Sequence, residues 1–135
     1  MKSIFKTPQV HIIGKICGGN NFEGDKLFVK YSIKTGDNWT LLKGEPNGET
    51  FLSTKKGTFT PLEHPLDLHY IAKAIRGWPK MIVEVWQEDE HGRNTISGYG
   101  LMTFPIAPGD FTLEIDCWRP KGGIIEKLLG TYPEL

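Results

Sequence analysis

The feature that most constrains the fold of this chain is an alternation of apolar and other residues with a period of two. In segment 27–34 the odd positions are Leu, Val, Tyr and Ile, and the even positions are Phe, Lys, Ser and Lys. Segment 81–86 has Met, Val and Val at its odd positions, and segment 111–118 has Phe, Leu, Ile and Cys. Successive side chains of a strand point to opposite faces, so the alternation predicts half-buried β-strands.

Turn residues separate the alternating segments at short intervals, and the chain has 16 glycines and 9 prolines. Thr-Gly-Asp-Asn at 35–38 predicts a turn because Gly and Asn tolerate positive φ. Asn47-Gly48 predicts a type I′ hairpin turn before a short strand at 51–52. We expect further strands over 10–16, 39–42, 64–72 and 99–104, although apolar residues within 70–75 also have helical spacing. Seven or eight short strands predict an all-β antiparallel sandwich, with a helical turn or two only at 124–129.

The composition limits the class of protein and its partners. A chain of 135 residues fits one domain, spanning 1–135. Lys and Arg number 16, as do Asp and Glu, so no net charge favours nucleic acid. Cys17 and Cys117 are too few and too distant for a disulfide framework, and no secretory signal precedes the first apolar run. No apolar stretch approaches the roughly 20 residues that span a bilayer. We therefore expect a soluble, cytoplasmic protein.

The sequence does not indicate an enzyme. It has no Gly-x-Ser-x-Gly motif. Gly98-Tyr99-Gly100 lies inside a strand pattern rather than before a helix, which disfavours a nucleotide site. His64 and His69 are five residues apart on a predicted strand, so they face opposite ways and do not share a metal. We expect no catalytic residues, cofactor or small-molecule substrate.

Two features leave a structural and a functional interpretation open. The loop 87–93, Gln-Glu-Asp-Glu-His-Gly-Arg, offers oxygen ligands for calcium, but one loop beside an arginine favours a solvated turn. Four tryptophans offer large, stiff surfaces. Packing is the favoured interpretation for Trp78 and Trp86, whereas Trp39 and Trp118 beside turns remain open between packing and partner contact.

A series of short motifs in fixed order resembles the B9-domain family over nearly the whole chain. The motifs are Val10-His11-Ile12-Ile13-Gly14, Thr35-Gly36 before Trp39, His64-Pro65-Leu66-Asp67-Leu68-His69, Gly77-Trp78-Pro79, Val85-Trp86, Gly92-Arg93, Gly98-Tyr99-Gly100 and Trp118-Arg119-Pro120. The resemblance implies a C2-like sandwich in a scaffold of the ciliary transition zone and basal body. It also implies hetero-oligomers with other B9-domain proteins and the Meckel-syndrome protein, without enzymatic activity.

The resemblance to C2 domains also allows their calcium positions to be compared with this chain. The first acid is replaced by Gln87, the second is kept as Asp89, and the later pair falls near Asn94 and Thr95. In the earlier loop Asp25 stands beside Lys26. Two carboxylates do not complete a calcium shell, so we expect no metal site. The resemblance also implies a further strand past the position of Leu135, so either the chain lacks its closing strand or the sheet ends on an unpaired edge.

Two function classes follow, each with its own candidate residues. A scaffold would contact its partners through Trp39, Trp118, Arg119 and Arg93. An autonomous, calcium-independent module would contact phospholipid weakly through Phe22, Lys26, Lys55 and Lys56.

Overall fold

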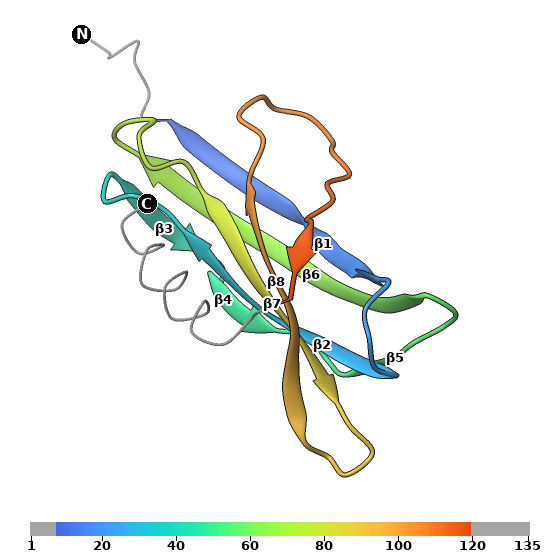
Figure 1. Ribbon diagram of the computed structural model, residues 1–135. Helices are drawn as coiled ribbons and strands as arrows, with labels where there is room; N and C mark the ends of the chain where they lie inside the picture. Colours follow the sequence, from blue (N-terminus) through green and yellow to red (C-terminus); the bar gives the residue numbers. More distant parts are fainter. Residues whose placement is uncertain (1–7, 120–135) are drawn as a thin grey trace, which may run out of the picture.

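The computed structural model describes residues 8–119 as two antiparallel sheets that form a sandwich (Figure 1). One sheet has the order β1-β6-β3, and the other has the order β4-β2-β7-β8-β9, with β5 also pairing with β2. The strands are β1 (Gln9–Asn20), β2 (Lys26–Lys34), β3 (Trp39–Lys43), β4 (Asn47–Glu49), β5 (Ser53–Thr54), β6 (Phe59–Ala72), β7 (Lys80–Glu88), β8 (Asn94–Thr103) and β9 (Cys117–Trp118). The predicted all-β, C2-like sandwich is confirmed.

The predicted alternation places the core between the two sheets. Val29 lies opposite Val85 and Tyr31 opposite Val83, so the odd positions of β2 and β7 share the inner face. The opposite sheet contributes Leu66, Leu68 and Tyr70 from β6. Burial of these side chains is the main favourable term that holds the sheets together.

The strand predicted at 64–72 is confirmed and begins earlier, at Phe59. It contains Pro65, although β6 is the middle strand of its sheet. The Ala72 amide donates to the Pro8 carbonyl, so the even residues of β6 bond to β1 and the odd ones face β3. β3 pairs with β6 only from His69 onward, so the nitrogen of Pro65 needs no partner there.

The hairpin turn predicted at Asn47-Gly48 is wrong. Both residues belong to β4, and the Ser32 hydroxyl donates to Asn47 Oδ1 at 2.6 Å. The chain instead crosses from one sheet to the other near Gly44, which has φ of +98° and lies against the Asp67 carbonyl, and β3 and β4 run in the same direction. The strand expected at 51–52 is likewise wrong, because pairing with β2 resumes only at Ser53.

The strand predicted over 111–118 forms only at Cys117–Trp118. Ile115 and Cys117 do pack against the core, as the alternation suggests, but Phe111 and Leu113 are exposed. The pairing to β8 reaches only Tyr99 and Gly100, so the residues before Cys117 are not paired with a strand although β8 continues to Thr103. The helical turn expected at 124–129 lies outside the described residues.

Candidate functional site

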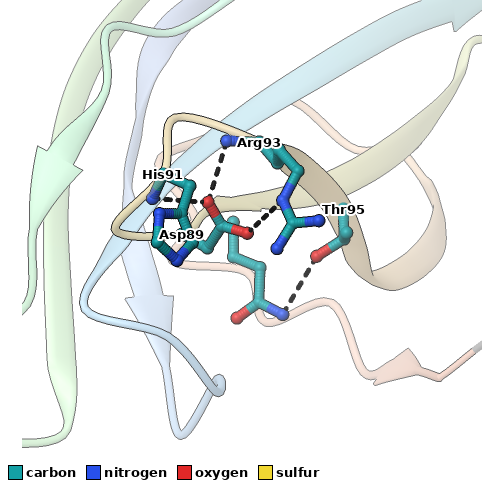
Figure 2. A network of polar contacts seen from close by, with 5 residues as sticks. Asp89, His91, Arg93 and Thr95 are labelled. Carbon is teal, nitrogen blue, oxygen red and sulfur yellow. Dashed lines mark hydrogen bonds and ion pairs between the residues drawn. The ribbon is translucent and has the colours of Figure 1, made fainter.

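Asp89 closes the turn between β7 and β8 with its own side chain (Figure 2). Its Oδ1 accepts the amide hydrogens of His91 and Arg93, both at 2.9 Å, and its Oδ2 accepts from Arg93 Nε at 3.1 Å. These donors favour the charged carboxylate, so the pKa of Asp89 lies below its ordinary value, with the Arg93 amide as the largest cause. The one acid kept at a C2 calcium position is thus used to fold the turn.

The other positions compared with C2 domains do not gather oxygen ligands around Asp89. Gln87 donates through Nε2 to the Thr95 hydroxyl at 3.1 Å. Asn94 is exposed, and the Asp25 carbonyl accepts from the Lys55 amide at 2.7 Å. Among residues 8–119, no three His, Cys, Asp or Glu side chains are grouped to hold a metal ion.

The candidate lipid contacts lie at the end of the sandwich that carries the Asp89 turn, but their side chains differ in exposure. Phe22 packs against the core, where a Cβ on Gly19 or Gly98 would approach its ring at 3.1–3.2 Å. Lys55 donates through Nζ to the Phe22 carbonyl. Lys26 and Lys56 are exposed. The Phe22 side chain, which was expected to contact lipid, is therefore packed against the core, and of the four candidates only Lys26 and Lys56 are exposed.

Trp39 lies in the core rather than on a partner surface. It is 7% exposed, its ring packs edge-on against Tyr70 and Trp78, and its Nε1 donates to the Arg76 carbonyl at 2.9 Å. The open question for Trp39 is answered in favour of packing. Trp86 stacks on Phe28, and both Trp78 and Trp86 are half-buried, as the packing interpretation suggests.

The remaining partner candidates stay on the surface. Trp118 is 38% exposed on β9, beside Tyr99 of β8. Arg119 forms an ion pair with Glu23 of the β1–β2 loop at 2.5 Å. Arg93 is held by Asp89. The structure thus places Trp118 and Arg119 together, whereas Trp39 belongs to the opposite sheet.

Two pairs that involve histidines were not predicted from the sequence, because each pair is formed by residues on different strands and depends on how those strands align. The Tyr31 hydroxyl and His64 Nε2 are 3.0 Å apart beside a surface hollow of about 400 Å³ that Glu45, Glu49 and Asp67 also line. On the other side of β6, the ring of His69 meets that of His11 edge-on, with centroids 3.8 Å apart. His64 and His69 therefore face opposite ways, as predicted.

The two antiparallel sheets define a C2-like β-sandwich, in which the Asp89 side chain holds the turn between β7 and β8. A family model described as "Ciliary basal body-associated, B9 protein" matches residues 10–135. This chain belongs to that family, B9-C2.

Its relatives include B9 domain-containing protein 2 of several animals. The Mus musculus protein is 40% identical over 125 residues, which cover 92% of this chain and 71% of the mouse protein. The Danio rerio protein is 38% identical over 132 residues, which cover 94% of this chain and 75% of the fish protein. B9 domain-containing protein 1 of Xenopus laevis is 27% identical over 115 residues, with 83% and 58% covered.

No solved structure matches this chain. In the part of the chain that the structure describes, no helix has the length and apolar character needed to cross a membrane.

Proposed function

We propose that this protein is a non-enzymatic scaffold subunit of a B9 assembly at the ciliary base. In this proposal it binds other B9-domain proteins and the Meckel-syndrome protein in the transition zone, and it supports ciliogenesis and the ciliary gate. The observation that carries the proposal is the family match over residues 10–135, which takes in nearly all of the described sandwich. The similarity to both B9 domain-containing proteins 1 and 2 supports assembly among members of one family.

The surface that best suits a partner is formed by Trp118 and Arg119. Cys117 packs inward, so its neighbour Trp118 faces away from the core. Trp and Arg are the residue types that most often contribute strongly to binding energy at interfaces. The Arg119 and Glu23 side chains are 63% and 67% exposed, so a partner carboxylate can replace Glu23 at little cost.

The test is co-expression with B9 domain-containing protein 1 of the same organism, followed by measurement of complex mass and dissociation constant. We expect a stable complex with the unaltered chain. Trp118→Ala and Arg119→Glu should each weaken it about tenfold or more, whereas Phe111→Ala, which truncates another exposed aromatic side chain, should not.

Two outcomes of this experiment count against different parts of the proposal. If the unaltered chain forms no complex, the scaffold function is contradicted. If all three variants assemble as tightly as the unaltered chain, the assembly stands and the Trp118–Arg119 surface is wrong.

A further inference from the structure

Two loops at one end of the sandwich are tied into a single rigid unit. They are the β2–β3 loop, residues 35–38, and the β6–β7 loop, residues 73–79. The Gly36 amide donates to the Gly77 carbonyl, the Lys73 amide to the Asn38 carbonyl, and Trp39 Nε1 to the Arg76 carbonyl, each at 2.9 Å. We call these two loops, together with Lys34 and Lys80 at the adjoining strand ends, the basic end.

The basic end lies opposite the Asp89 turn. β2 and β7 run antiparallel, so the loop after β2 and the loop before β7 meet at one end, whereas the Asp89 turn follows β7 at the other. Figure 1 shows this separation along the length of the sandwich. The basic end is therefore distinct from the loops that carry Phe22, Lys55 and Lys56.

The basic end presents an apolar side chain from a fixed backbone. Ile75 is 68% exposed at the middle of its loop. A third segment, residues 104–106 after β8, adjoins the basic end, and its Ile106 is 69% exposed. That segment is held in place because Trp78 Nε1 donates to the Phe104 carbonyl and the Phe104 amide donates to the Pro79 carbonyl. Hydrogen bonds on both sides of Ile75 hold its loop, and those of Phe104 hold the chain two residues before Ile106.

Positive charge surrounds Ile75. Lys73 and Arg76 flank it in the chain, and both are exposed. Segments 34–38 and 73–80 together contain four basic residues and one acidic residue, Asp37. Within residues 8–119, none of the four basic residues forms an ion pair.

Lys34 and Lys80 stand directly opposite each other across β2 and β7. Like charges in this position repel and destabilise a sheet. A bound anion would relieve that repulsion. The zero net charge of the whole chain thus conceals a local excess of positive charge at this end.

We propose that the basic end binds the surface of an anionic lipid bilayer. Ile75 and Ile106 enter the interfacial region, while Lys34, Lys73, Arg76 and Lys80 contact lipid phosphates. The two isoleucines protrude from separate loops, and a bilayer accepts protruding side chains without a preformed pocket. Each basic residue close to an anionic membrane strengthens binding about fivefold. This binding goes beyond the proposed scaffold function and does not depend on it.

The experiment is sedimentation of the full chain with phosphatidylcholine vesicles that contain about 30% phosphatidylserine, which gives the vesicles a negative surface potential like that of an anionic leaflet. We expect the chain to sediment with these vesicles and to stay in the supernatant with pure phosphatidylcholine. The variant Lys73→Glu/Arg76→Glu should lose at least about 25-fold in partitioning, and Ile75→Ser about tenfold. The matched control is Lys15→Glu/Lys43→Glu, which makes the same change of charge on exposed residues of β1 and β3, outside both the basic end and the end that carries Lys26 and Lys56.

Three results would overturn the proposal. The unaltered chain could remain in the supernatant with both vesicles. The control could lose as much binding as Lys73→Glu/Arg76→Glu, which would make the effect one of overall charge. Alternatively, Ile75→Ser could bind normally while soluble poly-glutamate displaces the chain, which would identify an acidic protein rather than a bilayer as the partner. Circular dichroism of each variant checks that it is folded, so that lost binding is not lost structure.

Discussion

Gly36 and Gly77 touch where the two loops of the basic end meet. A Cβ added to Gly77 would lie 2.5 Å from Gly36 Cα, and Gly77 has φ of +82°. Steric overlap and an unfavourable backbone conformation therefore act at the same residue. Single positions such as this one set how closely the loops approach.

A series of three glycine substitutions separates the two effects at Gly77. Gly77→Ala should lower the free energy of unfolding by about 2–4 kcal/mol, because it adds both strain and overlap. Gly57→Ala should lower it by about 1 kcal/mol, since Gly57 has φ of +65° with open space around it. Gly14→Ala, with open space and no positive φ, should change it by less than about 0.5 kcal/mol. Urea denaturation measures all three, and equal losses for Gly57 and Gly77 would show that the loop contact is not tight.

At the scale of elements, the edge of β2 is shared by the two short strands β4 and β5. Thr50 lies between them and is 4% exposed. Its amide donates to the Val29 carbonyl, and its hydroxyl oxygen accepts the Val29 amide hydrogen at 2.9 Å. A side chain thus takes the place of a ladder hydrogen bond where backbone pairing with β2 is interrupted.

Thr50→Val should therefore destabilise the protein despite keeping the shape of the side chain. The buried Val29 amide would lose its acceptor, which costs about 1–3 kcal/mol. Thr40→Val, an exposed threonine on β3, is the control and should stay within about 0.5 kcal/mol of the unaltered protein. Equilibrium unfolding in urea compares them. Equal stability of the two variants would mean that water replaces the lost acceptor at Val29.

At the scale of the whole molecule, the docking of β1 on β6 makes stability depend on pH. Burial lowers the pKa of His69 below its ordinary value of 6.5, with smaller contributions from His11 and Lys43. Its Nε2 lies 2.8 Å from Gln9 Oε1. The folded state therefore binds a proton at His69 less readily than the unfolded chain does.

It follows that the free energy of unfolding should decrease as the pH falls below about 6.5 and through the lower pKa of folded His69. Asp89 and Glu23, whose carboxyl pKa values are lowered, change the free energy of unfolding only at more acidic pH, where they become protonated. His69→Gln should flatten the dependence between pH 7 and pH 5, as measured by urea denaturation at each pH. An unchanged slope in that variant would assign the dependence to other groups.

Local patterns predicted the strands correctly where a neighbouring strand pairs along most of the segment. The alternation in 27–34 and 81–86 gave the correct inner face because β2 and β7 each pair on both sides. The same alternation failed at 111–118, where only Tyr99 and Gly100 supply partners. Asn47-Gly48 failed as a turn because both residues pair with β2 as part of β4, which continues in the direction of β3 after the chain crosses between the sheets near Gly44. An Asn-Gly pair permits a hairpin turn, but the pairing of Asn47 and Gly48 with β2 places both residues in a strand.

The candidate sites divide in the same way. The replaced acid at Gln87 could be recognised from the sequence alone, since a glutamine supplies no carboxylate in any fold. The burial of Trp39, the packing of Phe22 and the meeting of His11 with His69 depend on which strands lie side by side. The cations of the basic end come from positions 34, 73, 76 and 80, and only the antiparallel register of β2 with β7 and the hydrogen bonds between the loops bring them together.

The sequence by itself therefore determined the all-β class, the inner face of the long strands and the family, because each depends on side-chain type at local spacing. Tertiary structure alone decided which tryptophan is exposed, which loop carries the concentrated charge and where the short strands end. Those properties arise from contacts between residues far apart in the chain, and local sequence patterns do not specify such contacts.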